Sequence, residues 1–169
     1  SLANVIKEGN QLPLDDCVRI MNQLADTVAR IHSKGIVHRD LKPENIVLVR
    51  KEDTPYFVKL LDFGLAVNQS ITRLTGTGEI VGTINYLPPE QISRRQYSTA
   101  SDIYSLGVVF YELLTFQQPY IGQLPVDIIR QILDKEPLPP GRFRPGLPAS
   151  LDNLVMQMME KEPGCRPSE

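Results

Sequence analysis

The sequence predicts a mainly α-helical domain that carries one small β-hairpin. Apolar residues recur at spacings of three and four along residues 17–31, which is the pattern of an amphipathic helix. Two short runs rich in β-branched and aromatic residues, 46–49 and 56–61, flank a polar turn and indicate a hairpin. The stretch 103–114 is apolar on nearly every face and predicts a buried helix. The chain of 169 residues is long enough for one domain with its own core.

The first half of the chain is expected to begin with two helices. Three apolar residues between positions 2 and 6 indicate a short helix that ends at Gly9. The long helix follows Pro13, has acidic residues at its positive end and is terminated by Gly35. After the hairpin, residues 62–89 have no sustained period, and an unstructured connection of that length is usually functional.

Helices resume in the second half. Ser98 or Thr99 can cap the buried helix, and residues 125–133 suggest another one. The proline-rich stretch 137–148 reads as an irregular arm. A last amphipathic helix is expected over 151–159, capped by the serine just before it.

Composition excludes several classes of protein. A formal net charge of -2 provides no basic surface for nucleic acid or an anionic membrane. The longest apolar run is too short to cross a bilayer, so we expect no membrane contact by this segment. With only Cys17 and Cys165, no disulfide framework is implied. We expect a cytoplasmic location, which is equally compatible with a membrane-anchored parent protein.

Two motifs carry the chemistry. Residues 38–45 read His-Arg-Asp-Leu-Lys-Pro-Glu-Asn and lie between the long helix and the first strand. Asp62-Phe63-Gly64 directly follows the second strand. The order and context match the H-R-D-L-x-x-x-N catalytic loop and the D-F-G motif of protein kinases. The chain therefore resembles the C-terminal lobe of a eukaryotic-type (Hanks-type) Ser/Thr protein kinase, and residues 86–91 resemble bacterial-type members.

The resemblance assigns a role to each polar residue. Asp40 is placed to accept the proton of a substrate hydroxyl, and Asn45 with Asp62 to hold Mg²⁺ (or Mn²⁺) on ATP. Lys42 resembles the lysine that Ser/Thr kinases keep near the transferred phosphate, where it would act in catalysis and contact ATP. The resemblance makes His38 a structural residue that supports the loop. Each of the two motifs, taken alone, also fits a surface turn that is stabilised by side-chain to backbone hydrogen bonds. Only the order and spacing of the two motifs together favour the kinase interpretation.

The activation segment of the family is matched by residues 62–90, which include Gly64. Residues 82–90 resemble its G-T-x-x-Y-x-x-P-E close, so Thr83 is expected to contact the catalytic Asp and Lys. Glu90 resembles the glutamate that pairs with a late arginine, here Arg166. Asp102 resembles the aspartate that anchors the catalytic loop through backbone bonds.

Arg39 directly precedes the catalytic Asp40, as in kinases switched on by phosphorylation of the activation segment. A phosphate adds nearly two negative charges that an arginine can bind through paired hydrogen bonds. The candidate acceptors include Ser70 and Thr72, and we favour Thr75 or Thr77 because they lie nearest the segment to be ordered.

The resemblance covers residues 1–169 as a C-lobe fragment of a kinase catalytic domain. No glycine-rich loop, strand lysine or helix glutamate of the ATP-binding lobe fits within residues 1–37, so the simplest explanation is a piece of a longer protein. The expected partners are a protein substrate, and ATP held together with the N-lobe of the parent chain. The alternative hypothesis is a kinase lobe that serves as a non-catalytic docking or regulatory module.

We predict that residues 1–169 alone have no measurable kinase activity, because half of the ATP site is contributed by other residues. The measurement is transfer of labelled phosphate from ATP to a generic Ser/Thr substrate by the purified chain. Robust turnover would contradict this prediction.

Overall fold

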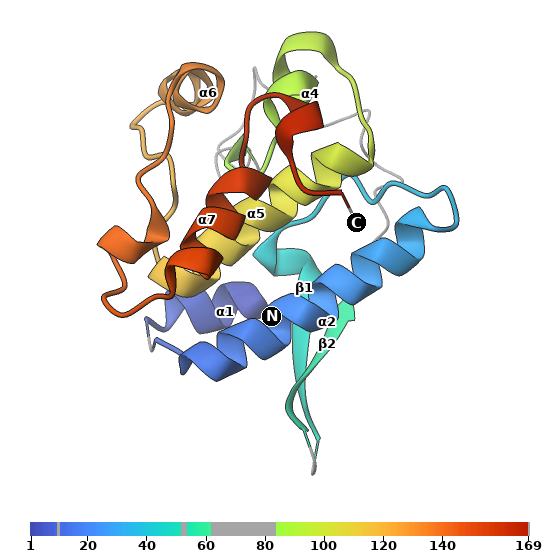
Figure 1. The fold of residues 1–169 in the computed structure, drawn as a ribbon, viewed down its shortest axis with the longest axis vertical. Helices are drawn as coiled ribbons and strands as arrows, with labels where there is room; N and C mark the ends of the chain where they lie inside the picture. The colour runs from blue at the N-terminus through green and yellow to red at the C-terminus, as the bar shows by residue number, and fades with distance from the viewer. Residues whose placement is uncertain (10, 52–53, 62–83, 169) are drawn as a thin grey trace.

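The computed structural model describes residues 1–9, 11–51, 54–61 and 84–168, and it confirms a mainly helical fold with one two-stranded sheet (Figure 1). The helices and strands follow in the order α1 (Leu2–Lys7), α2 (Leu14–His32), β1 (Ile46–Lys51), β2 (Thr54–Leu60), α4 (Pro89–Arg94), α5 (Thr99–Thr115), α6 (Pro125–Asp134) and α7 (Ala149–Met158). Short 3₁₀ turns add η1 (Pro43–Asn45), η3 (Pro140–Arg142) and η4 (Pro163–Cys165).

Helix α5 is the centre of the core. It packs against α2 and α7 (Figure 1). Its side chains are buried almost all the way round. The nearly continuous apolar run 103–114 requires this position, because no face of such a helix is stable in water. Ser98 is the residue that precedes α5, and its backbone N–H donates to the hydroxyl of Ser101 at 3.0 Å.

Helix α2 forms from the predicted apolar stripe. The residues buried along it include every member of that stripe: Cys17, Ile20, Met21, Leu24, Val28 and Ile31. Pro13 precedes its first residue, and Gly35 beyond its end has a φ of 71°, a backbone conformation that favours glycine. The far end of α2 therefore turns at a fixed point, directly before the catalytic-loop motif.

The hairpin is antiparallel and in register from Ile46 opposite Leu60 to Val49 opposite Phe57, with an irregularity before Lys51 pairs with Thr54. Gln23 of α2 binds strand β2. Its side chain donates to the carbonyl of Tyr56 at 2.8 Å and accepts from the N–H of Val58 at 3.1 Å. The hairpin projects from the helices at the end of the molecule opposite α6 (Figure 1).

One helix and the ends of several other elements differ from the sequence predictions. Helix α4 was not predicted, although a proline in its first turn followed by Glu90 is a recognised helix start. Helix α7 begins two residues earlier than expected, after Pro148, so the predicted cap Ser150 lies inside its first turn. Both strands extend further into the predicted polar turn, to Lys51 and from Thr54.

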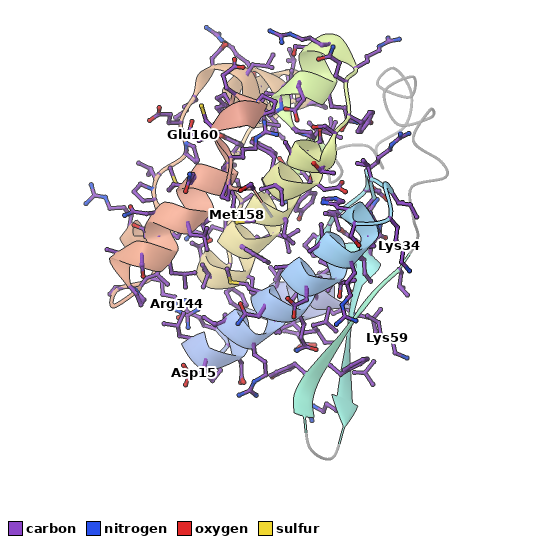
Figure 2. All side chains as sticks on the ribbon, turned by 45° about the vertical axis from the view of Figure 1, so that its right-hand side comes forward. Asp15, Lys34, Lys59, Arg144, Met158 and Glu160 are labelled. Carbon is purple, nitrogen blue, oxygen red and sulfur yellow. The ribbon has the colours of Figure 1, made fainter. Side chains whose placement is uncertain are left out.

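The close approach of α5 and α7 depends on Gly107. A Cβ built on this glycine would lie 2.8 Å from Cβ of Met158 and 3.3 Å from its backbone carbonyl carbon. Figure 2 shows Met158 on the side of α7 that faces α5.

We predict that Gly107→Ala lowers the free energy of unfolding by about 1–3 kcal/mol, because α7 must move outward. Urea denaturation measures the change. Gly164→Ala is the matched control, since a Cβ there meets nothing within 4 Å, and it should leave the unfolding midpoint unchanged. Equal unfolding midpoints for the two variants would contradict the prediction, because they would mean that α5 and α7 can move apart without a loss of stability.

Candidate active site

Asp40 is the centre of a cluster formed by the catalytic-loop motif. The ammonium of Lys42 lies 2.9 Å from its carboxylate. The amide nitrogen of Asn45 donates to the backbone carbonyl and to Oδ2 of Asp40, both at 2.8 Å. The Asp40 side chain is about one third exposed, at 31%, so the carboxylate is fixed in position and still open to a molecule from solvent.

Asn45 is held by the hairpin. It ends the 3₁₀ turn η1, its N–H donates to the carbonyl of Lys42 at 3.0 Å, and its own carbonyl accepts from the N–H of Leu61 at 2.8 Å. The second strand thus returns the chain to Asn45, as the sequence predicts. Because its amide nitrogen is turned to Asp40, the amide oxygen of Asn45 is left as an acceptor without a donor in the described part of the chain. A hard oxygen in that position fits a ligand of a divalent cation such as Mg²⁺.

The backbone of the loop is fixed by the buried carboxylate of Asp102. It accepts the N–H of His38 at 2.7 Å and the N–H of Arg39 at 2.9 Å. Arg39 has a φ of 69°, which a residue with a side chain seldom adopts without such support. Asp102 lies in the first turn of α5, where the helix dipole favours a negative charge.

Two histidines complete this arrangement. Nε2 of His32, at the end of α2, lies 2.8 Å from Oδ2 of Asp102, and both side chains are 1% exposed. His38 is fully buried, with Nε2 3.2 Å from the carbonyl of Leu61 and Nδ1 accepting the N–H of Asp40 at 3.3 Å. The sequence drew attention to His38 through its motif, whereas His32 carries no motif and its role depends on the crossing of α2 and α5.

Glu90 and Arg166 form a buried ion pair, with two hydrogen bonds of 2.8 Å between the guanidinium and the carboxylate. Arg166 also donates to the carbonyl of Ala100 at 2.7 Å and lies over the ring of Tyr104. Burial opposes the charge of Glu90, but hydrogen bonds from Arg166, its own backbone and Ser101 hold the pKa of this carboxyl below its ordinary value. The pair therefore links α4, α5 and the end of the chain.

Tyr86 and Glu112 form a second buried pair that the sequence did not reveal. The hydroxyl of Tyr86 donates to Oε2 of Glu112 at 2.5 Å. Burial is the main cause that raises the pKa of both groups, and the nearby charge of Glu44 raises it further. The contact joins the segment that begins at Ile84 to the last turns of α5. Neither residue lies in a motif that names a partner, so only the fold brings them together.

Several predicted site residues lie outside the described residues. They are Asp62, Gly64, Thr75, Thr77 and Thr83. Their expected roles stay predictions. Within residues 1–9, 11–51, 54–61 and 84–168, no group of three or more His, Cys, Asp or Glu side chains is arranged to hold a metal.

A family model described as the protein kinase domain matches residues 1–169. The chain belongs to the protein kinase family. It is 34% identical to serine/threonine-protein kinase PknB of Mycobacterium leprae over 167 residues, 98% of this chain and 26% of the relative. It is 35% identical to PrkC of Bacillus subtilis (96% and 24%) and 38% identical to Pkn1 of Myxococcus xanthus (94% and 23%), both also named Ser/Thr kinases.

These matches confirm the predicted family, of the bacterial Hanks type, and the fold class. Protein kinases as a family use ATP and a divalent metal ion. The chain spans about a quarter of the length of the three relatives. Among the described residues, no helix is both long and apolar enough to cross a membrane.

We predict that Glu90→Gln lowers the free energy of unfolding by about 3–5 kcal/mol at pH 7, because Arg166 is left buried without its counter-charge. The lowered pKa of Glu90 adds a pH dependence: its stabilisation is complete above the ordinary glutamate pKa and is lost as the pH falls through the folded value. The stability of Glu90→Gln should accordingly fall less between pH 5 and pH 3 than that of the unmodified chain.

Chemical denaturation across this pH range measures both effects. Glu160→Gln is the matched control, since Glu160 is exposed on the surface (Figure 2). If the two variants were equally stable at every pH, the ion pair would contribute nothing.

Proposed function

We propose that the protein containing this chain transfers the γ-phosphate of ATP to Ser or Thr hydroxyls of a protein substrate. The observation that carries the proposal is the cluster of Asp40, Lys42 and Asn45, with polar contacts of 2.8–2.9 Å, on a loop fixed by Asp102. Phosphoryl transfer requires positioned charge and an aligned hydroxyl more than covalent chemistry. This cluster supplies the positioned charge and a carboxylate that could accept the proton of a substrate hydroxyl.

Each residue has one task in this proposal. Asp40 accepts the proton of the substrate hydroxyl. Lys42 balances the carboxylate charge and is proposed to contact the transferred phosphoryl group. Thr83 is proposed to contact Asp40 and Lys42. Asn45 through its amide oxygen and Asp62 through its carboxylate are the proposed ligands of Mg²⁺ or Mn²⁺, an ion that would neutralise charge on the phosphates.

The wider assignments follow from that activity. We propose that residues 1–169 are the C-terminal lobe of the catalytic domain, with the activation segment at 62–90. ATP would then bind between this lobe and an N-lobe of the parent chain. Because the activity requires ATP, we place the chain in the cytoplasm. We further propose that the guanidinium of Arg39 binds a phosphate group carried by Thr75 or Thr77, and that phosphorylation at this position raises the kinase activity.

We predict that Asp40→Asn lowers kcat of the full-length protein by about 10²–10⁴, because the general base is lost while the shape of the side chain is kept. Labelled ATP with a Ser/Thr peptide pool provides the measurement. Asp134→Asn, at an exposed position on α6, is the control and should keep normal activity. Full activity of Asp40→Asn would refute the base assignment, whereas absence of phosphoryl transfer by the unmodified full-length protein would favour the docking-module hypothesis.

We predict phosphate on Thr75 or Thr77 after incubation of the full-length protein with ATP. Peptide mapping by mass spectrometry detects it. The double variant Thr75→Val/Thr77→Val should show a loss of activation, while Ser70→Ala should not. Absence of phosphate from Ser70 to Thr77 would refute the phosphosite proposal and leave the catalytic proposal standing.

A further inference from the structure

Arg39 differs from its charged neighbours Asp40 and Lys42 in the catalytic loop. Its backbone is fixed, since its N–H donates to Asp102 Oδ1 at 2.9 Å and its φ is 69°. Its guanidinium forms no hydrogen bond and no ion pair with the residues that the structure describes, whereas Asp40, Lys42 and Asn45 are bonded to one another. Among the described residues, therefore, no polar contact orients this guanidinium.

The contact that it does make is aromatic. The guanidinium carbon of Arg39 lies 5.3 Å from the centroid of the Tyr97 ring, within the range of a cation–π interaction. Tyr97 comes from the short connection between α4 and α5, one residue before the cap Ser98. Two residues at the start of α5 therefore contact Arg39. Asp102 binds its backbone, and the ring of Tyr97 contacts its side chain.

The hydroxyl of Tyr97 does not explain why the residue is there. This oxygen is buried and has no hydrogen-bond partner within the part of the chain that the structure describes, which is unusual for a buried phenol. Burial raises the pKa of Tyr97 to about 12, while the nearby charge of Arg39 lowers it and that of Asp40 raises it. The hydroxyl is therefore neutral at physiological pH and lies close to both charges. The ring face, and not the hydroxyl, makes the contact that matters to Arg39.

We propose that Tyr97 is a positioning residue for Arg39, and that its ring holds the guanidinium ready to bind a phosphate monoester. The inference rests on the proposed function of Arg39 as a phosphate receptor. A planar guanidinium lying over a ring keeps the N–H groups at its edge available to phosphate oxygens. A side chain held in its binding conformation loses less entropy when the anion binds, so the ring increases affinity without touching the phosphate.

The test uses the full-length protein and four variants: Tyr97→Phe, Tyr97→Leu, Arg39→Gln, and Gln96→Leu as an exposed neighbouring control. The first measurement is the ratio of kinase activity before and after complete dephosphorylation. The second is the rate at which an added phosphatase removes phosphate from the activation segment, because a bound phosphate is protected. A role in packing alone would change the unfolding midpoint and neither of these quantities.

We expect Tyr97→Phe to keep both quantities within about twofold, because the ring remains. Tyr97→Leu should lower the activity ratio by about five- to tenfold and speed phosphate removal by a similar factor, as expected for loss of a cation–π contact of ordinary strength. Gln96→Leu should match the unmodified protein, and Arg39→Gln should abolish protection.

The outcomes separate the two proposals. If the unmodified protein shows no phosphate dependence, or Arg39→Gln changes nothing, the proposed role of Arg39 fails and the role of Tyr97 with it. If Arg39→Gln abolishes the dependence and Tyr97→Leu keeps it in full, only the inference about Tyr97 is overturned. Inorganic phosphate added to dephosphorylated protein identifies the source of the anion. Activation that Tyr97→Leu weakens would assign the same site to the free ion, whereas no activation would assign it to a phosphorylated residue of the chain.

Discussion

The buried carboxylate of Asp102 is the interaction on which the rest of the site depends. It lies in the first turn of the central helix α5 and accepts the backbone N–H groups of two consecutive loop residues, His38 and Arg39. Hydrogen bonds to a charged group contribute about 1.5–3 kcal/mol each, enough to hold the positive φ of Arg39. The next residue is Asp40, so the direction in which its carboxylate points is determined from the core of the domain. His32, bonded to the same carboxylate, extends this dependence to the end of α2.

The Glu90–Arg166 pair stabilises the same junction from the other side. Arg166 reaches α4 through Glu90 and the start of α5 through the carbonyl of Ala100. The hydroxyl of Ser101 donates to Glu90 at 2.8 Å and accepts the backbone N–H of Ser98 at the start of α5. Residues 90–102 are consequently fixed at both ends, which is what allows one short connection to present both Asp102 and Tyr97 to the catalytic loop. The site is built from segments about sixty residues apart in the chain, and its geometry is a property of the packed core.

Much of the fold could be predicted from the sequence because the signals are local. The apolar stripe of α2 and the continuous apolar run of α5 each determine an element without reference to a partner. The catalytic-loop motif also singled out Asp40, Lys42 and Asn45, which lie within six residues, although it did not predict the contacts among them. Contacts between segments that are distant in the chain could be predicted only where the family resemblance indicates a pair, as it does for Glu90 and Arg166. Tyr86 with Glu112, His32 with Asp102, and Tyr97 with Arg39 have no local signature, because helix crossings decide which side chains meet. Helix α4 was missed since six residues show too little periodicity to stand out.

The two ends of the hairpin are under different constraints. At one end, Ile46 is paired with Leu60, and the N–H of Leu61 is bonded to Asn45, so a slip of one residue would reverse which side chains face the core. At the other end, the strands extend away from the helices (Figure 1). Changes in length there add loop-closure entropy that grows only slowly with length. Insertions between Lys51 and Thr54 are therefore expected to leave the bond between Leu61 and Asn45 unchanged. Variation in chain length at this end of the hairpin is in this way separated from the geometry of the candidate site.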